Sequence, residues 1–133
     1  MKKLIILTVA AISISACSST PTEMRAKAPS QVFSSQQDAK QVASCVADKW
    51  DSWVNRFSDW GVVKLEETEQ GYSISALKYG PDPDDGSGPK PTTINYLADV
   101  ENESSGSVTK LYQFMSLNLG KNPFFTAVEE CQG

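Results

Sequence analysis

The sequence predicts an α+β domain of two layers, in which a four-stranded antiparallel meander sheet carries two helices on one face, in the order α-β-β-β-β-α. Two amphipathic helical patterns lie at about residues 36–56 and from Asn122 onward. Four runs rich in β-branched and aromatic residues lie between them, bounded by Gly, Pro or acidic turn residues. One cysteine falls in each helical pattern, so a disulfide can join the two helices.

The first helix is the clearest element. Ser34 or Ser35 can act as its N-cap. Its apolar residues recur at spacings of three and four and therefore share one stripe, which contains Ala39, Val42, Ala43, Val46, Trp50, Trp53, Val54 and Phe57. We expect this stripe to face the core. Its aromatic residues could instead stack on a ligand, although aromatic residues at helical spacing are usually core.

The expected strands are residues 61–67, 71–79, 91–100 and 106–115. Their connections are short or rich in turn residues, so successive hairpins are the simplest topology. The third run alternates most cleanly. One of its faces holds Thr92, Ile94, Tyr96, Ala98 and Val100, and the other holds Thr93, Asn95 and Asp99, with Leu97 as an apolar exception. We expect one sheet face to be covered and the other to be largely wet.

The last helix can begin at Asn122 as a cap, with Pro123 in the first turn. Its stripe contains Phe124, Ala127, Val128 and Cys131. Cys45 lies beside the stripe of the first helix, so in an oxidising compartment Cys45 and Cys131 should pair. A redox-active or metal-binding pair is the alternative, but the chain has neither C-x-x-C spacing nor a histidine.

Residues 1–16 have the pattern of a secretion signal. A basic start, Met1-Lys2-Lys3, precedes an uncharged stretch that is too short for a hydrocarbon core requiring about 20 residues. The sequence Ile14-Ser15-Ala16-Cys17 resembles the lipobox of bacterial lipoproteins. This resemblance implies cleavage before Cys17, a diacylglycerol thioether on its sulfur and acylation of its new amino group. An ordinary signal peptide with a coincidental cysteine is the alternative.

The residue after Cys17 is Ser18 rather than an aspartate. Among enterobacterial lipoproteins this implies an outer-membrane anchor, with the domain facing the periplasm. The chain as a whole is similar to small proteobacterial envelope lipoproteins, a resemblance that implies no activity. Residues 17–33 contain few apolar groups, so we expect a lipidated flexible tether with a reach of about 20 Å. Residues 34–133 then form a single domain.

The charge balance limits the partners. The chain has 12 basic and 16 acidic residues, and the leader holds two of the basic ones, so the mature chain carries 10 − 16 = −6. Nucleic acid is therefore a disfavoured partner, and a basic protein is favoured. Without histidine, imidazole catalysis and imidazole metal ligation are impossible. We expect no cofactor and no metal.

Chemistry is harder to locate. The loop between the second and third expected strands carries Asp82, Asp84, Asp85 and Lys90 and could bind a partner, although a solvated hairpin loop is the simpler interpretation. Its acids lack the spacing of an EF-hand.

Acids available for carboxylate catalysis are Asp59, Glu66, Glu67 and Asp99. No nucleophile elbow or phosphate-binding loop is present. We expect a noncatalytic binding lipoprotein, such as an inhibitor or immunity-type factor; a glycan hydrolase and an envelope scaffold are the alternatives.

Overall fold

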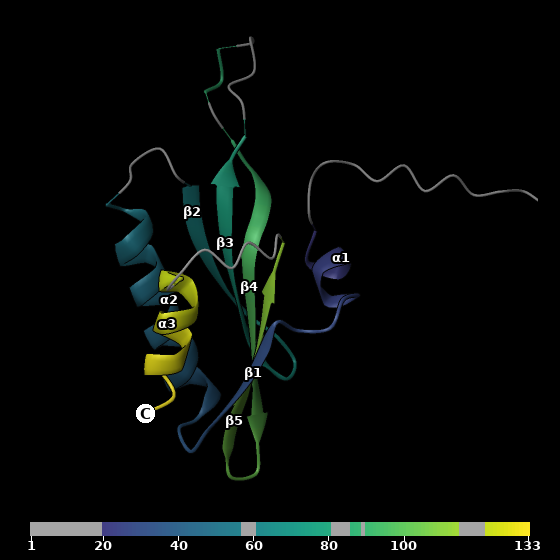
Figure 1. Cartoon of the computed structure of the whole chain (residues 1–133), viewed down its shortest axis with the longest axis vertical. Helices are drawn as coiled ribbons and strands as arrows, with labels where there is room; N and C mark the ends of the chain where they lie inside the picture. Colours follow the sequence, from purple (N-terminus) through teal and green to yellow (C-terminus); the bar gives the residue numbers. More distant parts are fainter. Residues whose placement is uncertain (1–19, 57–60, 81–85, 89, 115–121) are drawn as a thin grey trace, which may run out of the picture.

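The protein forms an α+β fold built on one antiparallel sheet (Figure 1). The computed structural model describes residues 20–56, 61–80, 86–88, 90–114 and 122–133. The described elements are α1 (Pro21–Arg25), β1 (Gln31–Ser35), α2 (Ala39–Val54), β2 (Gly61–Glu67), β3 (Gly71–Tyr79), β4 (Pro91–Glu103), β5 (Gly106–Gln113) and α3 (Pro123–Glu130). The order in the sheet is β1-β5-β4-β3-β2. The four expected strands are present as the meander from β2 to β5.

The expectation of four strands is wrong by one, because β1 adds to the free edge of β5. It pairs antiparallel, from Gln31 opposite Leu111 to Ser35 opposite Ser107. Only Phe33 of this strand packs against the main core, so the strand depends largely on backbone pairing. Its weak apolar pattern explains why composition placed it in a tether. The part of the expected tether from Thr20 onward contains α1 and most of β1, so it belongs to the fold.

Helix α2 begins later than Ser34 or Ser35 would have placed it. Asp38 is the N-cap, and its side chain accepts a hydrogen bond of 2.8 Å from the backbone N–H of Gln41. The two serines are the last residues of β1 instead. The hydroxyl of Ser35 donates to the carbonyl of Gln132 at 2.6 Å. The expected cap residues therefore connect the first strand to the C-terminal segment.

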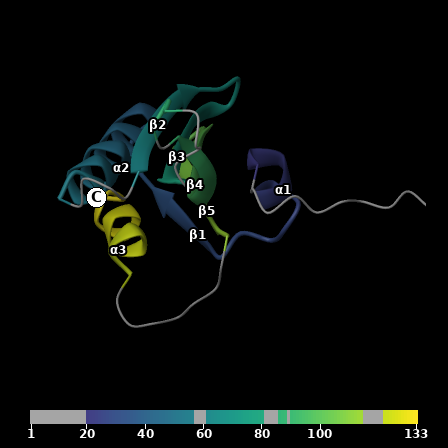
Figure 2. The same ribbon diagram turned by 90° about the horizontal axis from the view of Figure 1, so that it is seen from above.

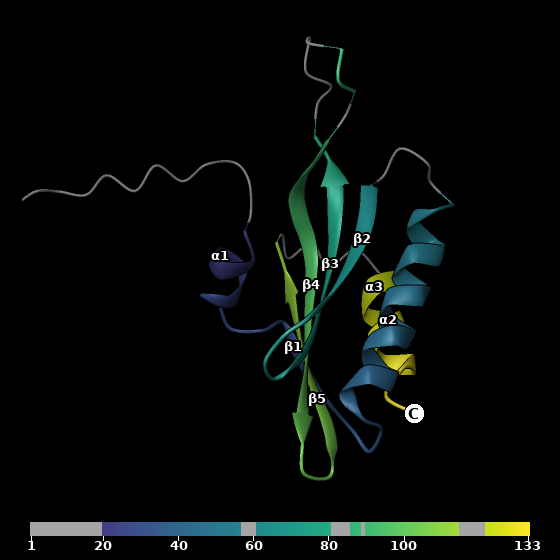
Figure 3. The ribbon, with the colours of Figure 1, turned by 180° about the vertical axis from the view of Figure 1, so that it is seen from behind.

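Helices α2 and α3 pack on the same face of the sheet, as expected, and α1 lies on the other face (Figures 2 and 3). The main core lies under α2 and α3. Trp50 is fully buried there, and its indole N–H donates to the carbonyl of Phe124 at 3.1 Å. Trp50 also meets the ring of Phe124 edge-on. The aromatic residues of α2 therefore take part in the core, which favours packing over the ligand-stacking alternative.

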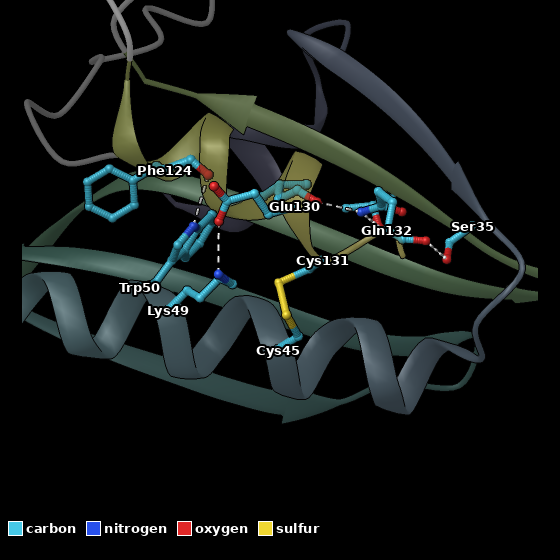
Figure 4. The surroundings of a disulfide bond; sticks show 10 residues. Ser35, Cys45, Lys49, Trp50, Phe124, Glu130, Cys131 and Gln132 are labelled. Carbon is cyan, nitrogen blue, oxygen red and sulfur yellow. Dashed lines mark hydrogen bonds and ion pairs between the residues drawn. A yellow bond between two sulfur atoms is a disulfide. The ribbon is translucent and has the colours of Figure 1, made fainter.

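The disulfide between Cys45 and Cys131 is confirmed, and it joins α2 to the end of α3 (Figure 4). The two Cα atoms are 5.7 Å apart. Nearby, Lys49 of α2 forms an ion pair of 2.8 Å with Glu130 of α3. The covalent link and the aromatic contacts together fix α3 over the sheet.

The alternation expected for the third run breaks at Asn95. In the pairing of β3 with β4, Ala76 lies opposite Tyr96 but Leu77 lies opposite Ile94, so Asn95 is an extra residue in the ladder. Such a bulge places the two residues that flank it, here Ile94 and Tyr96, on opposite faces. Ile94 consequently joins Leu97 on the face that carries α1, rather than Tyr96 on the core face. The face expected to be wet therefore contains a second apolar cluster.

Candidate functional site

Helix α1 docks on the second apolar cluster, which contains Met24, Ile94, Leu97 and Tyr112. The helix begins with a capping box, in which Thr20 and Glu23 each bond the backbone N–H of the other. This arrangement directs Met24 into the cluster, where it is 4% exposed. The next residue, Arg25, then reaches across the sheet to β4. The docked helix thus places a cation on the sheet face opposite α2 and α3.

Arg25 donates two hydrogen bonds to the carboxylate of Asp99. Its Nε donates to Oδ2 at 2.7 Å and its Nη2 donates to Oδ1 at 2.8 Å. The same Nη2 also donates to the hydroxyl of Ser73 on β3 at 3.1 Å. The hydrogen bonding of Arg25 to Asp99 is the main reason that the pKa of Arg25 is raised. Because both oxygens of Asp99 are engaged, this carboxylate serves to hold α1 on the sheet.

Tyr112 lies in the same cluster and is 8% exposed. Burial raises the pKa of its phenol, and the negative charge of Asp99 raises that pKa further. The phenol therefore stays protonated to a higher pH than an exposed tyrosine would. Its role in the site is that of a neutral side chain next to an ion pair.

An open pocket of about 400 Å³ adjoins this ion pair. Its lining includes Arg25 from α1, strand residues of the sheet and the turn between β2 and β3; the lining residues are Arg25, Thr68, Glu69, Gln70, Tyr72, Asp99, Glu101 and Tyr112. Among them, Glu69 is exposed, and Glu101 shares a longer ion pair of 3.4 Å with Lys110. The pocket therefore presents carboxylates around an arginine that Asp99 already neutralises. We call it the Arg25 pocket.

A second hollow of about 520 Å³ lies between α2 and α3. Lys49, Ser52, Trp53, Arg56, Pro123, Thr126, Ala127 and Glu130 line it. The ion pair of Lys49 with Glu130 bridges the two helices beside it (Figure 4). This hollow is more open than the Arg25 pocket and lies on the opposite side of the sheet.

Several residues singled out in the sequence fall outside the described part of the chain. These are Cys17, expected to be lipidated, the loop acids Asp82, Asp84 and Asp85, Asp59, and Phe57 of the expected helix stripe. Lys90 is described and exposed, and its carbonyl accepts a hydrogen bond of 2.9 Å from the N–H of Gly80. That bond closes the base of the loop. The partner-binding interpretation of the loop remains a prediction.

Among the carboxylates offered for catalysis, Glu66 and Asp99 lie on the same face of the sheet, on the strands at either side of Ser73, and the charge of Glu66 contributes to the raised pKa of Arg25. Glu66 and Glu67 are neighbours on β2, so their side chains point to opposite faces of the sheet. Asp99 is held by Arg25. Across residues 20–56, 61–80, 86–88, 90–114 and 122–133, no three His, Cys, Asp or Glu side chains are grouped so that they could hold a metal ion. Within those same ranges, no helix is long and apolar enough to cross a membrane.

Arg25 and Tyr112 were not predicted as site residues from the sequence. A signal for α1 was present, since Thr20-Pro21-Thr22-Glu23 has a capping residue, a proline at the first helical position and a glutamate three residues after the cap. No local sequence pattern indicated that Arg25 pairs with Asp99, because the two residues are 74 positions apart.

No protein-family model matches this chain, and no curated protein and no solved structure shows a significant similarity to it.

Proposed function

We propose that this protein is a lipid-anchored envelope protein of the outer membrane that faces the periplasm and binds another protein without catalysing a reaction. The anchor rests on the lipobox resemblance at Cys17. The binding role rests on the Arg25 pocket, and a basic partner suits it best. An inhibitor or immunity-type factor against an incoming envelope-attacking enzyme is the narrower form of the proposal.

The single observation that carries the binding role is the open pocket beside a carboxylate that is already neutralised. A hydrolytic acid or base must exchange a proton with its substrate, whereas both oxygens of Asp99 are bonded to Arg25. The exposed Glu69 lines the pocket together with the partly exposed Glu101, which forms a 3.4 Å ion pair with Lys110. These charges can steer a basic protein to the sheet face and position it there.

The binding role is tested with the full chain in intact envelopes and with a purified basic glycan-cleaving enzyme, lysozyme, as the probe. The variant E69K/E101K reverses two pocket charges. The control D48K/E129K reverses two exposed acids on α2 and α3, on the other side of the sheet, and changes the net charge equally. We expect the wild type and the control to capture lysozyme or a basic envelope protein at low salt, and the pocket variant to lose it. Equal capture by both variants would reject the pocket as the binding surface.

The anchor is tested separately by mass spectrometry of the N-terminal peptide of the mature protein. We expect Cys17 to be the first residue, with a diacylglycerol thioether on its sulfur and an acyl group on its amino group. The variant C17S should be released from membranes. An unmodified Cys17 in the membrane-bound protein would contradict the anchor without affecting the binding role.

A further inference from the structure

Strand β2 lies at an edge of the sheet, and its neighbour β3 occupies only one side of it. The turn that joins them fixes which backbone groups are used. Thr68 and Gly71 bond each other reciprocally, at 2.9 Å and 3.3 Å. Because the pattern alternates along an antiparallel pair, Val62, Lys64 and Glu66 also bond toward β3. The N–H and C=O groups of Val63, Leu65 and Glu67 therefore point to the free edge.

This free edge carries exposed side chains of three kinds. Leu65 is 44% exposed, which makes it one of the two most exposed large hydrophobic residues in the described part of the chain. It pairs with buried Ile74, so it lies on the face covered by α2. Lys64 and Glu66 flank it and lie on the opposite face, where Glu66 pairs with Ser73. Along this edge, Leu65 therefore lies on one face of the sheet. Its two neighbours in the sequence, Lys64 and Glu66, place opposite charges on the other face.

From this pattern we propose that β2 pairs antiparallel with β2 of a second copy of this chain, which extends the sheet across a two-fold axis at Leu65. In this register Leu65 lies opposite Leu65 of the second copy. Lys64 of each chain lies opposite Glu66 of the other, which gives two ion pairs related by symmetry. Val63 lies opposite Glu67. The outward groups of Leu65, Val63 and Glu67 then form hydrogen-bonded pairs that they do not make with the described part of their own chain.

The charges of Lys64 and Glu66 favour this register over the neighbouring registers that also have two-fold symmetry. An axis at Lys64 would place Lys64 opposite Lys64, and an axis at Glu66 would place Glu66 opposite Glu66. An axis at Val63 would place Lys64 opposite Val62. Only the axis at Leu65 gives opposite charges, and it places them in the non-hydrogen-bonded pair, where facing side chains are closest.

Edge β1 does not offer the same specificity. Its sequence, Gln-Val-Phe-Ser-Ser, has an exposed Val32 but no charged residue to set a register. A lysine on an edge strand usually deters pairing with other chains. On β2 the lysine deters strands of arbitrary sequence but is matched by Glu66 in a second copy of the same strand. A second copy is therefore the partner that this edge fits.

The test uses full-length chain in detergent, with its protein mass measured by size-exclusion chromatography and multi-angle light scattering over a range of concentrations. The variants K64E and E66K each place like charges opposite one another twice per dimer. We expect each to weaken dimerisation by about tenfold. The double variant K64E/E66K restores both pairs with the charges exchanged, so it should dimerise as the wild type does. An equimolar mixture of K64E and E66K should form a heterodimer, because each chain then complements the other.

The matched controls are K27E and E129K, which make the same charge changes at exposed positions beyond α1 and on α3. Both should dimerise as the wild type does. Circular dichroism verifies that every variant is folded. A wild type that stays monomeric at the highest concentration reached would overturn the proposal. So would a dimer that K64E leaves unchanged, a dimer that K27E or E129K disrupts, or a mixture that forms no heterodimer.

Discussion

Arg25 and Asp99 are 74 residues apart in the sequence, and they form a two-bond ion pair that holds α1 on the sheet. The side chain of Asp99 is only 12% exposed, whereas that of Arg25 is 39% exposed. Removing the arginine would therefore leave a nearly buried carboxylate without its cation, while removing an exposed pair costs little.

The variant R25Q should lower the free energy of unfolding by about 1–3 kcal/mol, because Asp99 loses a charged partner in a poorly solvated place. Urea denaturation measures this change, and hydrogen exchange at residues 20–26 should increase. The control K49A removes the exposed pair with Glu130 and should cost less than about 1 kcal/mol. Equal effects of the two variants would contradict a holding role for Arg25.

The disulfide should be the largest single contribution to stability. On the loop-entropy relation, closing a separation of 86 residues restricts the unfolded chain by about 4–5 kcal/mol, which is an upper estimate. The double variant C45S/C131S should therefore unfold at much lower urea concentration. Limited proteolysis should cut near α3 first, since the disulfide is the covalent part of the contacts that hold that short helix on α2. A variant with unchanged stability would show that packing of α3 alone suffices.

Stability should fall at alkaline pH because of Tyr112. Its pKa is raised in the folded protein, so above about pH 10 the unfolded chain gives up the phenol proton first. The folded state then binds more protons than the unfolded state, and the free energy of unfolding decreases as the pH rises further. Below about pH 10, the contribution of Tyr112 to the free energy of unfolding does not change with pH. Thermal denaturation between pH 8 and pH 12 should show a shallower decline for Y112F than for the wild type.

Gly106 permits the approach of β1 to the start of β5. A Cβ atom at this position, where φ is +142°, would run into the carbonyl oxygen of Ser35. We expect G106A to cost about 1–3 kcal/mol and to increase hydrogen exchange in β1. Gly86 also has a positive φ, at +77°, but open space surrounds it. The control G86A therefore measures the backbone strain without the contact, and it should leave β1 protected.

The elements that repeat a strong local pattern could be predicted from the sequence. The stripe of α2, the four runs rich in β-branched and aromatic residues and the position of the two cysteines led to the meander, the shared helix face and the disulfide. Elements that depend on distant partners could not. Strand β1 exists because β5 offers an edge, and the pocket exists because Arg25 meets Asp99 across the sheet.

The face assignment failed at the bulge in β4. Strict alternation placed Ile94 with Tyr96, and the bulge at Asn95 moved it to the other face. A bulge leaves no composition signal in a strand of this kind. Leu97, the apolar exception in the predicted wet face, was the one residue that pointed to a second cluster there.

Under the proposed acylation of Cys17, the docking of α1 would determine how the domain stands above a lipid bilayer. With α1 fixed to the sheet, three peptide steps separate Cys17 from Thr20, the N-cap of α1, and three steps span at most about 11 Å when fully extended. An acylated Cys17 would therefore keep the α1 side next to the headgroups, with little freedom to tumble. A protein that engages the Arg25 pocket would have to approach along the membrane plane, which suits a partner that is itself confined to the envelope.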